Sequence, residues 1–91
     1  MNTRYRQRTE LRIAELKDEG IVLHLGSRRY FTVSETGLRI LELLREPRTL
    51  AELTRRLVDR YDVTEEHAEQ SVRQFIAACR DANLLVAVRS E

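Results

Sequence analysis

The chain has 91 residues, of which 34% are charged, and a formal net charge of +1. A chain of this length forms one small domain and cannot enclose a deep catalytic cleft with several layers of supporting residues. The near-neutral charge gives no electrostatic reason to expect a nucleic acid or a membrane surface as a partner. The single cysteine, Cys79, excludes an internal disulfide, and no apolar run approaches the length of a membrane span. We therefore expect a soluble, cytoplasmic domain.

The first ten residues are rich in arginine and contain one aromatic side chain, Tyr5. Terminal segments with few apolar residues are poorly ordered unless another element ties them down. We predict a flexible basic tail over residues 1–10, with a basic arm that touches an acidic partner as the alternative. A single domain is predicted over residues 11–88.

Three β-like segments follow the tail and are separated by polar turns. They span residues 11–16, 21–25 and 30–33. In the second segment, Ile21 and Leu23 share one face by the two-residue period, and His24 lies on the opposite face, where we expect a surface or rim position. Gly20 is expected to take a positive φ in the first turn. Two hairpins in series predict a three-stranded antiparallel meander.

Three helices are predicted after the meander, each preceded by a hydroxyl residue suited to the N-cap position. The predicted N-caps are Ser34, Thr49 and Thr64. Glu52 completes a capping box with Thr49, Pro47 ends the first helix, and Asn83 ends the third. Residues 84–88 are β-like and either add a short strand or pack as a tail. A meander followed by three helices is an α+β fold.

The sequence carries no constellation typical of catalysis. His24 and His67 are far apart and have no metal-ligand spacing with Cys79. Cys79 lies on the apolar stripe of the third helix, where a small buried side chain is the simpler interpretation. Glu65 and Glu66 are explained by their favourable position in the first turn of a helix. We predict no enzyme activity, no metal and no cofactor.

The helices over residues 50–82 resemble a helix-turn-helix, so a winged-helix DNA-binding regulator is one alternative. Its recognition helix would begin with Glu65, Glu66 and Glu69. Because attraction to phosphates dominates affinity for DNA, an acidic helix tip argues against this function. We therefore expect no nucleic acid among the partners.

The third predicted strand, about residues 29–33, has no further strand after it until the end of the chain. It should therefore lie at a sheet edge with unpaired N–H and C=O groups. Such an edge can accept a peptide as an added strand, with pockets for alternate side chains. The third helix, about residues 65–82, is the expected wall of the groove beside it.

The segment from Tyr30 to Gly37, which opens a leucine-rich helix, and the ending Asn83-Leu84-Leu85 resemble the PqqD-like domain. In that family the strand-to-helix junction often reads aromatic-x-x-Leu-Asn-x-Thr-Gly. Here Val33 replaces the leucine and Ser34 the asparagine, and serine caps a helix as well as asparagine does. The similarity covers about residues 10 to 86 and implies a winged-helix-like fold.

The resemblance implies that the chain recognises the leader segment of a ribosomally made precursor peptide. The leader would add antiparallel to the third strand, in the cleft against the third helix. The short length is similar to the discrete recognition proteins of lasso-peptide pathways, which present the precursor to a separate cysteine protease before a cyclase acts. Their leaders commonly carry a Tyr-x-x-Pro-x-Leu pattern. The alternative within the family is a PqqD-type chaperone for a radical enzyme, and a bare edge can also pair with a second copy of the chain.

The predicted peptide-binding site consists of a backbone edge and a helix wall. The edge comprises Arg29, Tyr30, Phe31, Thr32 and Val33. The wall comprises Val72, Arg73, Phe75, Ile76, Cys79 and Arg80. Tyr30 or Phe31 is expected in the apolar pocket, and Arg73 and Arg80 are expected to pair with leader carboxylates.

Overall fold

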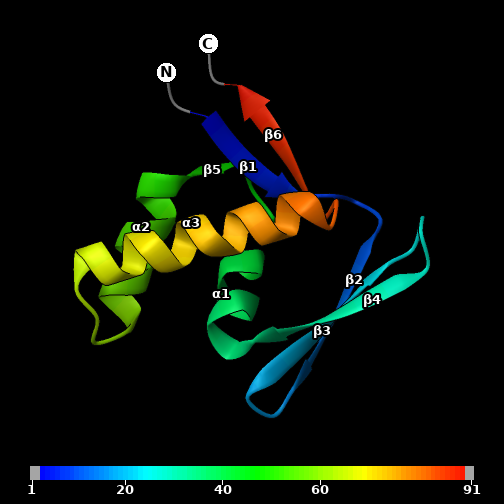
Figure 1. Cartoon of the computed structure of the whole chain (residues 1–91), viewed down its shortest axis with the longest axis horizontal. Helices are drawn as coiled ribbons and strands as arrows, with labels where there is room; N and C mark the ends of the chain where they lie inside the picture. The colour runs from blue at the N-terminus through cyan, green and yellow to red at the C-terminus, as the bar shows by residue number, and fades with distance from the viewer. Residues whose placement is uncertain (1–2, 90–91) are drawn as a thin grey trace.

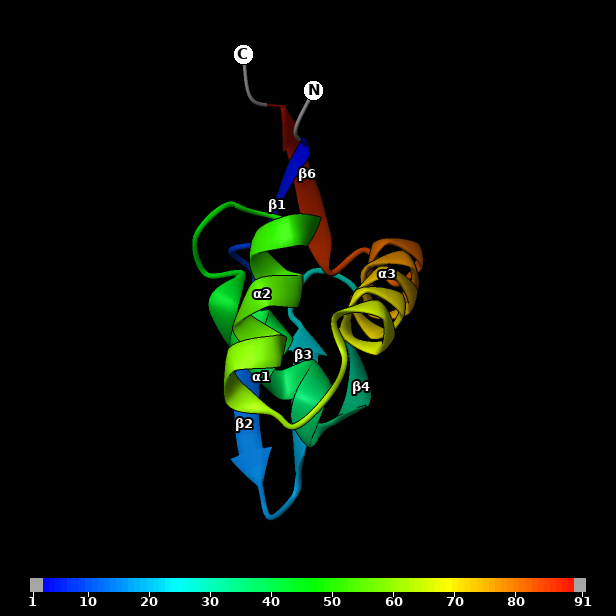
Figure 2. The same ribbon diagram turned by 90° about the vertical axis from the view of Figure 1, so that its left-hand side faces the viewer.

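The computed structural model describes residues 3–89 (Figure 1). The strands are β1 (Thr3–Gln7), β2 (Leu11–Leu16), β3 (Glu19–His24), β4 (Arg29–Ser34), β5 (Arg48–Thr49) and β6 (Leu85–Arg89). The helices are α1 (Glu35–Leu43), α2 (Leu50–Arg60) and α3 (Glu65–Asp81). The meander β2–β3–β4 followed by three helices confirms the predicted α+β class. The strands form two separate small sheets, with β1 and β6 toward one end of the molecule and the β2–β3 hairpin at the other (Figures 1 and 2).

The turn between β2 and β3 differs from the sequence prediction. Leu16 pairs with Glu19, so Lys17 and Asp18 form the turn, and Asp18 takes the positive φ, at 64°. The prediction that Gly20 does so was wrong. Gly20 is buried within β3, and a Cβ on it would lie 2.8 Å from Cδ1 of Leu38. The glycine is therefore needed for close approach of β3 to α1.

The meander sheet packs one face on the helices and leaves the other uncovered. Val22 and His24 point inward and are buried. Ile21 and Leu23 lie on the outer face, where Leu23 pairs with Tyr30 of β4. The prediction that His24 is a surface or rim residue was wrong, since only 6% of it is exposed. Its Nδ1 accepts the backbone N–H of Ser27 at 3.1 Å, which fixes the turn before β4.

The second sheet has the order β5–β1–β6 and corrects the prediction of a flexible tail over residues 1–10. Residues 3–7 pair with β6 over five residue pairs, while residues 1 and 2 lie outside the described part of the chain. Tyr5 packs against the core, and Gln7 donates from its backbone to Leu44 O (2.7 Å) and from its side chain to Leu41 O (2.7 Å). These bonds satisfy carbonyls at the end of α1, which would otherwise lack partners.

The predicted helix starts are confirmed by their caps, whereas α1 ends at Leu43, before Pro47, which was predicted to end it. Ser34 accepts the N–H of Gly37, Thr49 and Glu52 form the complete capping box, and Thr64 accepts the N–H of His67. Asn83 ends α3 with a φ of 62°. The N–H groups of residues 83 and 84 return to carbonyls of the last turn, at 3.0 and 2.8 Å, which is a Schellman motif.

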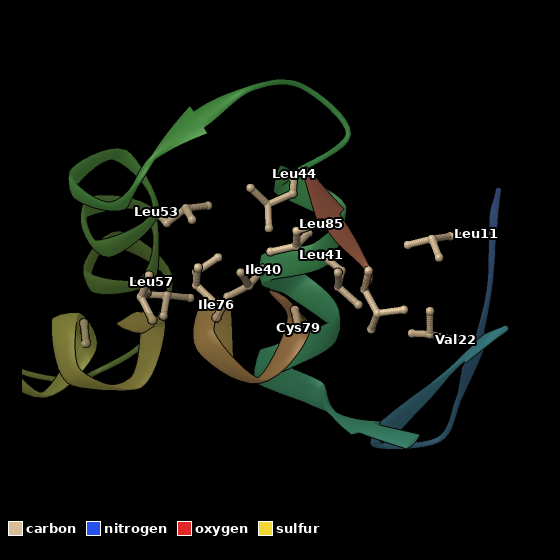
Figure 3. Packing of buried hydrophobic residues seen from close by; sticks show 13 residues of the cluster. Leu11, Val22, Ile40, Leu41, Leu44, Leu53, Leu57, Ile76, Cys79 and Leu85 are labelled. Carbon is tan, nitrogen blue, oxygen red and sulfur yellow. The ribbon is translucent and has the colours of Figure 1, made fainter. Parts of the chain in front are cut away.

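The hydrophobic core lies between the three helices and the inner face of the meander (Figure 3). Ile40 and Leu41 of α1, Leu53 of α2 and Val72 of α3 are at most 1% exposed. Leu85 brings β6 into the same cluster. Among residues 3–89, no helix combines the length and apolar character needed to cross a membrane.

Candidate functional site

Strand β4 forms an edge of the meander sheet, as the sequence predicted. It pairs with β3 over residues 29–34, and no other strand in residues 3–89 pairs with it. In an antiparallel pair, alternate residues direct their N–H and C=O groups away from the partner. The outer side of β4 is therefore a row of backbone donors and acceptors that a further strand can use.

The side chains of β4 alternate between two environments. Phe31 and Val33 are half-buried and pack against the core on the side of the helices. Tyr30 and Thr32 lie on the outer face, and Tyr30 is 71% exposed. Arg29 lies on the same side as Phe31, with its guanidinium 5.7 Å from the centre of that ring. Phe31, rather than Tyr30, is thus the aromatic residue beside the helices.

A pocket of about 350 Å³ opens where β4 runs into α1 and meets α3. It is lined by Ser34, Thr36, Gly37, Ile40, Ser71, Gln74 and Phe75. A smaller pocket of about 120 Å³ shares Thr36 and Ser71 and continues toward Tyr61 and His67. Together they form one depression between the first turn of α1 and α3, which we call the α1–α3 depression.

Gly37 explains how α1 and α3 come together at the depression. A Cβ on Gly37 would lie 2.7 Å from Cε1 of Phe75, which is closer than real Cβ contacts allow. The missing side chain therefore leaves room for the Phe75 ring against α1. Gly37 is also the last residue of the junction motif on which the family resemblance rests. The packing of Phe75 against α1 explains why the motif has a glycine at this position.

Three of the predicted wall residues lie in the core rather than at the surface. Val72, Ile76 and Cys79 are 0%, 4% and 3% exposed. Burial raises the pKa of the Cys79 thiol to about 12, as expected for a side chain surrounded by apolar groups. These residues support the wall from beneath, and Phe75 is the predicted wall residue that lines the depression.

Two further predicted residues lie on the opposite flank of α3. Arg73 donates to Glu69 at 3.0 Å and lines a pocket shared with α2. Arg80 has its guanidinium 5.8 Å from the centre of the Tyr5 ring, in the second sheet. The structure therefore does not bring Arg73 or Arg80 together with β4.

Sequence reasoning missed Ser71 and Gln74, which line the depression with Phe75. Ala78, one turn later, continues the same flank by helical spacing. We call Ser71, Gln74, Phe75 and Ala78 the β4 flank of α3. The available signal was a run of small or neutral residues at positions i, i+3, i+4 and i+7, beside the core stripe.

Another pocket is lined by charged side chains, one of which forms ion pairs within the domain. A pocket of about 440 Å³ lies between α1 and α2, and Arg39 at its edge donates to Glu15 and Glu42, each at 2.8 Å. The hydrogen bond and charge of Arg39 hold the pKa of Glu15 below its usual value. No group of three or more potential metal-ligating side chains occurs within residues 3–89.

The antiparallel meander has a free edge and leads directly into three helices, so the chain is a small α+β domain. The family model described as Coenzyme PQQ synthesis protein D (PqqD) matches residues 19–85. The chain belongs to the PqqD family. No curated protein sequence matches the chain.

Solved structures agree with this assignment. One described as TbiB1 in complex with the TbiA(beta) leader peptide is 27% identical, with a TM-score of 0.80 and coverage of 93% of this chain and 99% of that chain. A structure described as lasso peptide synthetase B1 complexed with the leader peptide has 20% identity, a TM-score of 0.76 and coverage of 90% of this chain and 96% of that chain. The PqqD part of Methylobacterium extorquens PqqCD, described as a stand-alone recognition element, has 18% identity, a TM-score of 0.74 and coverage of 91% and 88%.

Proposed function

We propose that the chain binds the leader segment of a ribosomally made precursor peptide, which adds as a strand to β4 beside α3. The observation that carries the proposal is the free edge of β4 (residues 29–34) next to the α1–α3 depression. The backbone donors and acceptors along the outer side of β4 supply affinity that does not depend on the sequence of the peptide. The depression selects which peptide side chains fit. The leader-bound state of TbiB1, the most similar of the three structures described above, supports this function.

The proposed contacts revise the sequence prediction. The backbone of Arg29–Val33 remains the edge, and Phe31 with the β4 flank of α3 supplies the side-chain contacts. Val72, Ile76 and Cys79 position that flank from the core. Arg73 and Arg80 are excluded from direct contact in this proposal because they face α2 and the second sheet.

The proposed role of the bound state is presentation of the precursor to a separate processing enzyme, most simply the leader protease of a lasso-peptide pathway. Burial and a pKa of about 12 make the Cys79 thiol unsuited to act as a nucleophile. The chain should therefore accelerate removal of the leader by the protease without cleaving it alone. The PqqD-type role beside a radical enzyme is the runner-up, and the neighbouring genes distinguish the two settings.

Fluorescence titration with a labelled leader peptide from the neighbouring precursor gene tests binding. We expect a dissociation constant between nanomolar and tens of micromolar, since buried area alone does not fix affinity. A cognate leader that fails to bind at tens of micromolar would falsify the proposal.

Backbone methylation of the leader tests strand addition without altering the protein. Two leader peptides are compared, one N-methylated at every odd position and the other at every even position. One of them should lose binding and the other should bind nearly as well as the unmodified leader, because only every second amide N–H faces β4. Equal effects of both sets would show that the peptide does not bind as a strand.

A further inference from the structure

We propose that Arg29 determines specificity by pairing with a carboxylate of the bound peptide, so that the guest carries Asp or Glu opposite the start of β4. This inference rests on the proposed strand addition at β4 and adds the charge of the guest at one defined position. It also replaces Arg73 and Arg80, the arginines that the sequence suggested for this role.

The position of Arg29 decides which guest residue it meets. It is the first residue of β4 and pairs with His24 of β3. By alternation its side chain lies on the same side of the sheet as Phe31 and Val33, which face the helices. In an added strand, the directly opposed residue points to the same side, with its Cβ about 4.5–5.5 Å away. A guest carboxylate there is within reach of the guanidinium.

The guanidinium of Arg29 is oriented before any guest arrives. Its Cζ lies over the Phe31 ring, 5.7 Å from the ring centre, which is within cation–π range and favours this orientation of the exposed side chain. A side chain that is already held loses less rotamer freedom on forming a new bond. The planar edge matches a carboxylate in a bidentate pair.

Arg29 also has no acidic partner of its own within residues 3–89. The arginine ion pairs there involve Arg4, Arg8, Arg39, Arg48 and Arg73. On the neighbouring strand its opposed residue is His24, whose Nδ1 accepts a backbone N–H. Arg28 precedes it in the turn, so the start of β4 carries two adjacent cations.

The other end of the groove has the opposite charge. Glu35 follows β4 directly, in the first turn of α1, and accepts a hydrogen bond from Tyr61 at 3.3 Å. The groove therefore has a basic end at Arg29 and an acidic residue beside the α1–α3 depression. This polarity predicts that the guest carboxylate lies at the Arg29 end and not over the depression.

A peptide-display selection tests the proposal. The probe is a randomised 14-residue library, selected in parallel on the wild type, on Arg29→Glu and on Arg12→Glu. Arg12 is the matched control because it undergoes the same charge change on the outer face of the same sheet. We expect one position of the wild-type pool to be enriched in Asp and Glu, the same position to be enriched in Lys and Arg on Arg29→Glu, and the Arg12→Glu pool to match the wild type.

The affinity of one selected peptide then measures how much the pair between Arg29 and the acidic residue contributes to binding. Replacing its acidic residue by the amide should weaken binding to the wild type about fivefold at low salt, as for a partly exposed ion pair, and should have no effect on Arg29→Gln. Equal charge preferences in the wild-type and Arg29→Glu pools, or an amide effect that survives in Arg29→Gln, overturn this inference. If the wild type enriches no peptide, or only peptides insensitive to backbone methylation, the proposed function itself fails.

Discussion

The two flanks of α3 differ in composition and in what they face. The flank toward α2 and the second sheet carries Glu69 and Arg73, which pair with each other beside a pocket shared with α2. It also carries Arg80, whose guanidinium lies over the Tyr5 ring. The β4 flank carries small or neutral side chains and the ring of Phe75 beside an open depression. The charged residues of the first flank thus interact within the domain, whereas the β4 flank presents small or neutral side chains beside the free edge of β4.

The buried residues Val72, Ile76 and Cys79 of α3 support both flanks. Shortening one of these side chains should have the largest effect on stability. Ile76→Ala removes a side chain that is 4% exposed, so the free energy of unfolding should fall by about 2–5 kcal/mol. Urea denaturation measures the loss. Gln70→Ala, at an exposed position of α3, is the control and should change it by less than about 0.5 kcal/mol. A loss below about 1 kcal/mol in Ile76→Ala would contradict the core assignment.

The close approach of α1 to the β4 flank should be the next most sensitive feature. Gly37→Val places a branched side chain where a Cβ would already lie 2.7 Å from Phe75, and such overpacking costs about 1–3 kcal/mol. Thermal and urea unfolding measure the cost. Phe75→Leu in the same chain should recover part of it, since the smaller side chain relieves the clash. Independent, additive effects of the two changes would show that these residues do not contact each other.

The contrast between the flanks is tested most directly by placing the same residue on each. Ser71→Trp fills the α1–α3 depression, so leader affinity should fall at least about tenfold, or 1.4 kcal/mol. Arg73→Trp puts the same bulk on the flank toward α2, where we expect less than about a twofold change. Fluorescence titration gives both values, and near-equal losses would mean that the leader does not distinguish the flanks.

The smallest expected effect on stability concerns Glu52 in α2. The backbone N–H of Thr49, with the charge of Arg4, holds the pKa of Glu52 below its usual value of about 4.5. Because the pKa is lower in the folded state, the contribution to stability is present at neutral pH and disappears as pH falls through the lowered pKa. Glu52→Gln should therefore unfold more easily at pH 7, by less than about 1 kcal/mol because the carboxylate is exposed.

Urea titrations of the wild type and Glu52→Gln at several pH values measure the Glu52 effect. The difference should shrink as pH falls below 4.5 and be smallest below the lowered folded-state pKa of Glu52, where the group is neutral in both states. A difference that stays constant between pH 7 and pH 3 would assign it to packing instead of charge. Leader affinity at pH 7 should be the same in both proteins, because Glu52 lies on α2, away from β4.

Local sequence signals predicted the helices and the open edge well. Hydroxyl caps and a capping box are short-range chemistry, so Ser34, Thr49 and Thr64 located the helix starts correctly. The position of β4 at the edge followed from strand order alone. The β1 strand was missed because its stabilising contacts are distant in sequence: Gln7 bonds to carbonyls of α1, and Arg4 pairs with Glu52.

The orientation of α3 was the part of the candidate site that the sequence left open. The spacing of Val72, Ile76 and Cys79 shows which stripe is buried, but a stripe has two sides, and only packing decides which side meets β4. The chemistry of Arg73 and Arg80 predicts contact with peptide carboxylates, but in the fold these side chains lie toward α2 and the second sheet. The environment of His24 was missed for a related reason, since nothing local reveals that the turn at Ser27 closes over it.

The pairing of β1 with β6 also sets how the domain can be joined to other chains. Thr3 pairs with Arg89, so the two ends of the described chain emerge side by side, at the opposite end of the molecule from the β2–β3 hairpin (Figure 1). A short linker across this gap would produce a circular backbone, with Lys17–Asp18 as an exposed turn for new ends. Equally, a second protein attached through residue 3 or residue 89 would join at the sheet that does not contain β4, so β4 would keep its free edge in such a fusion.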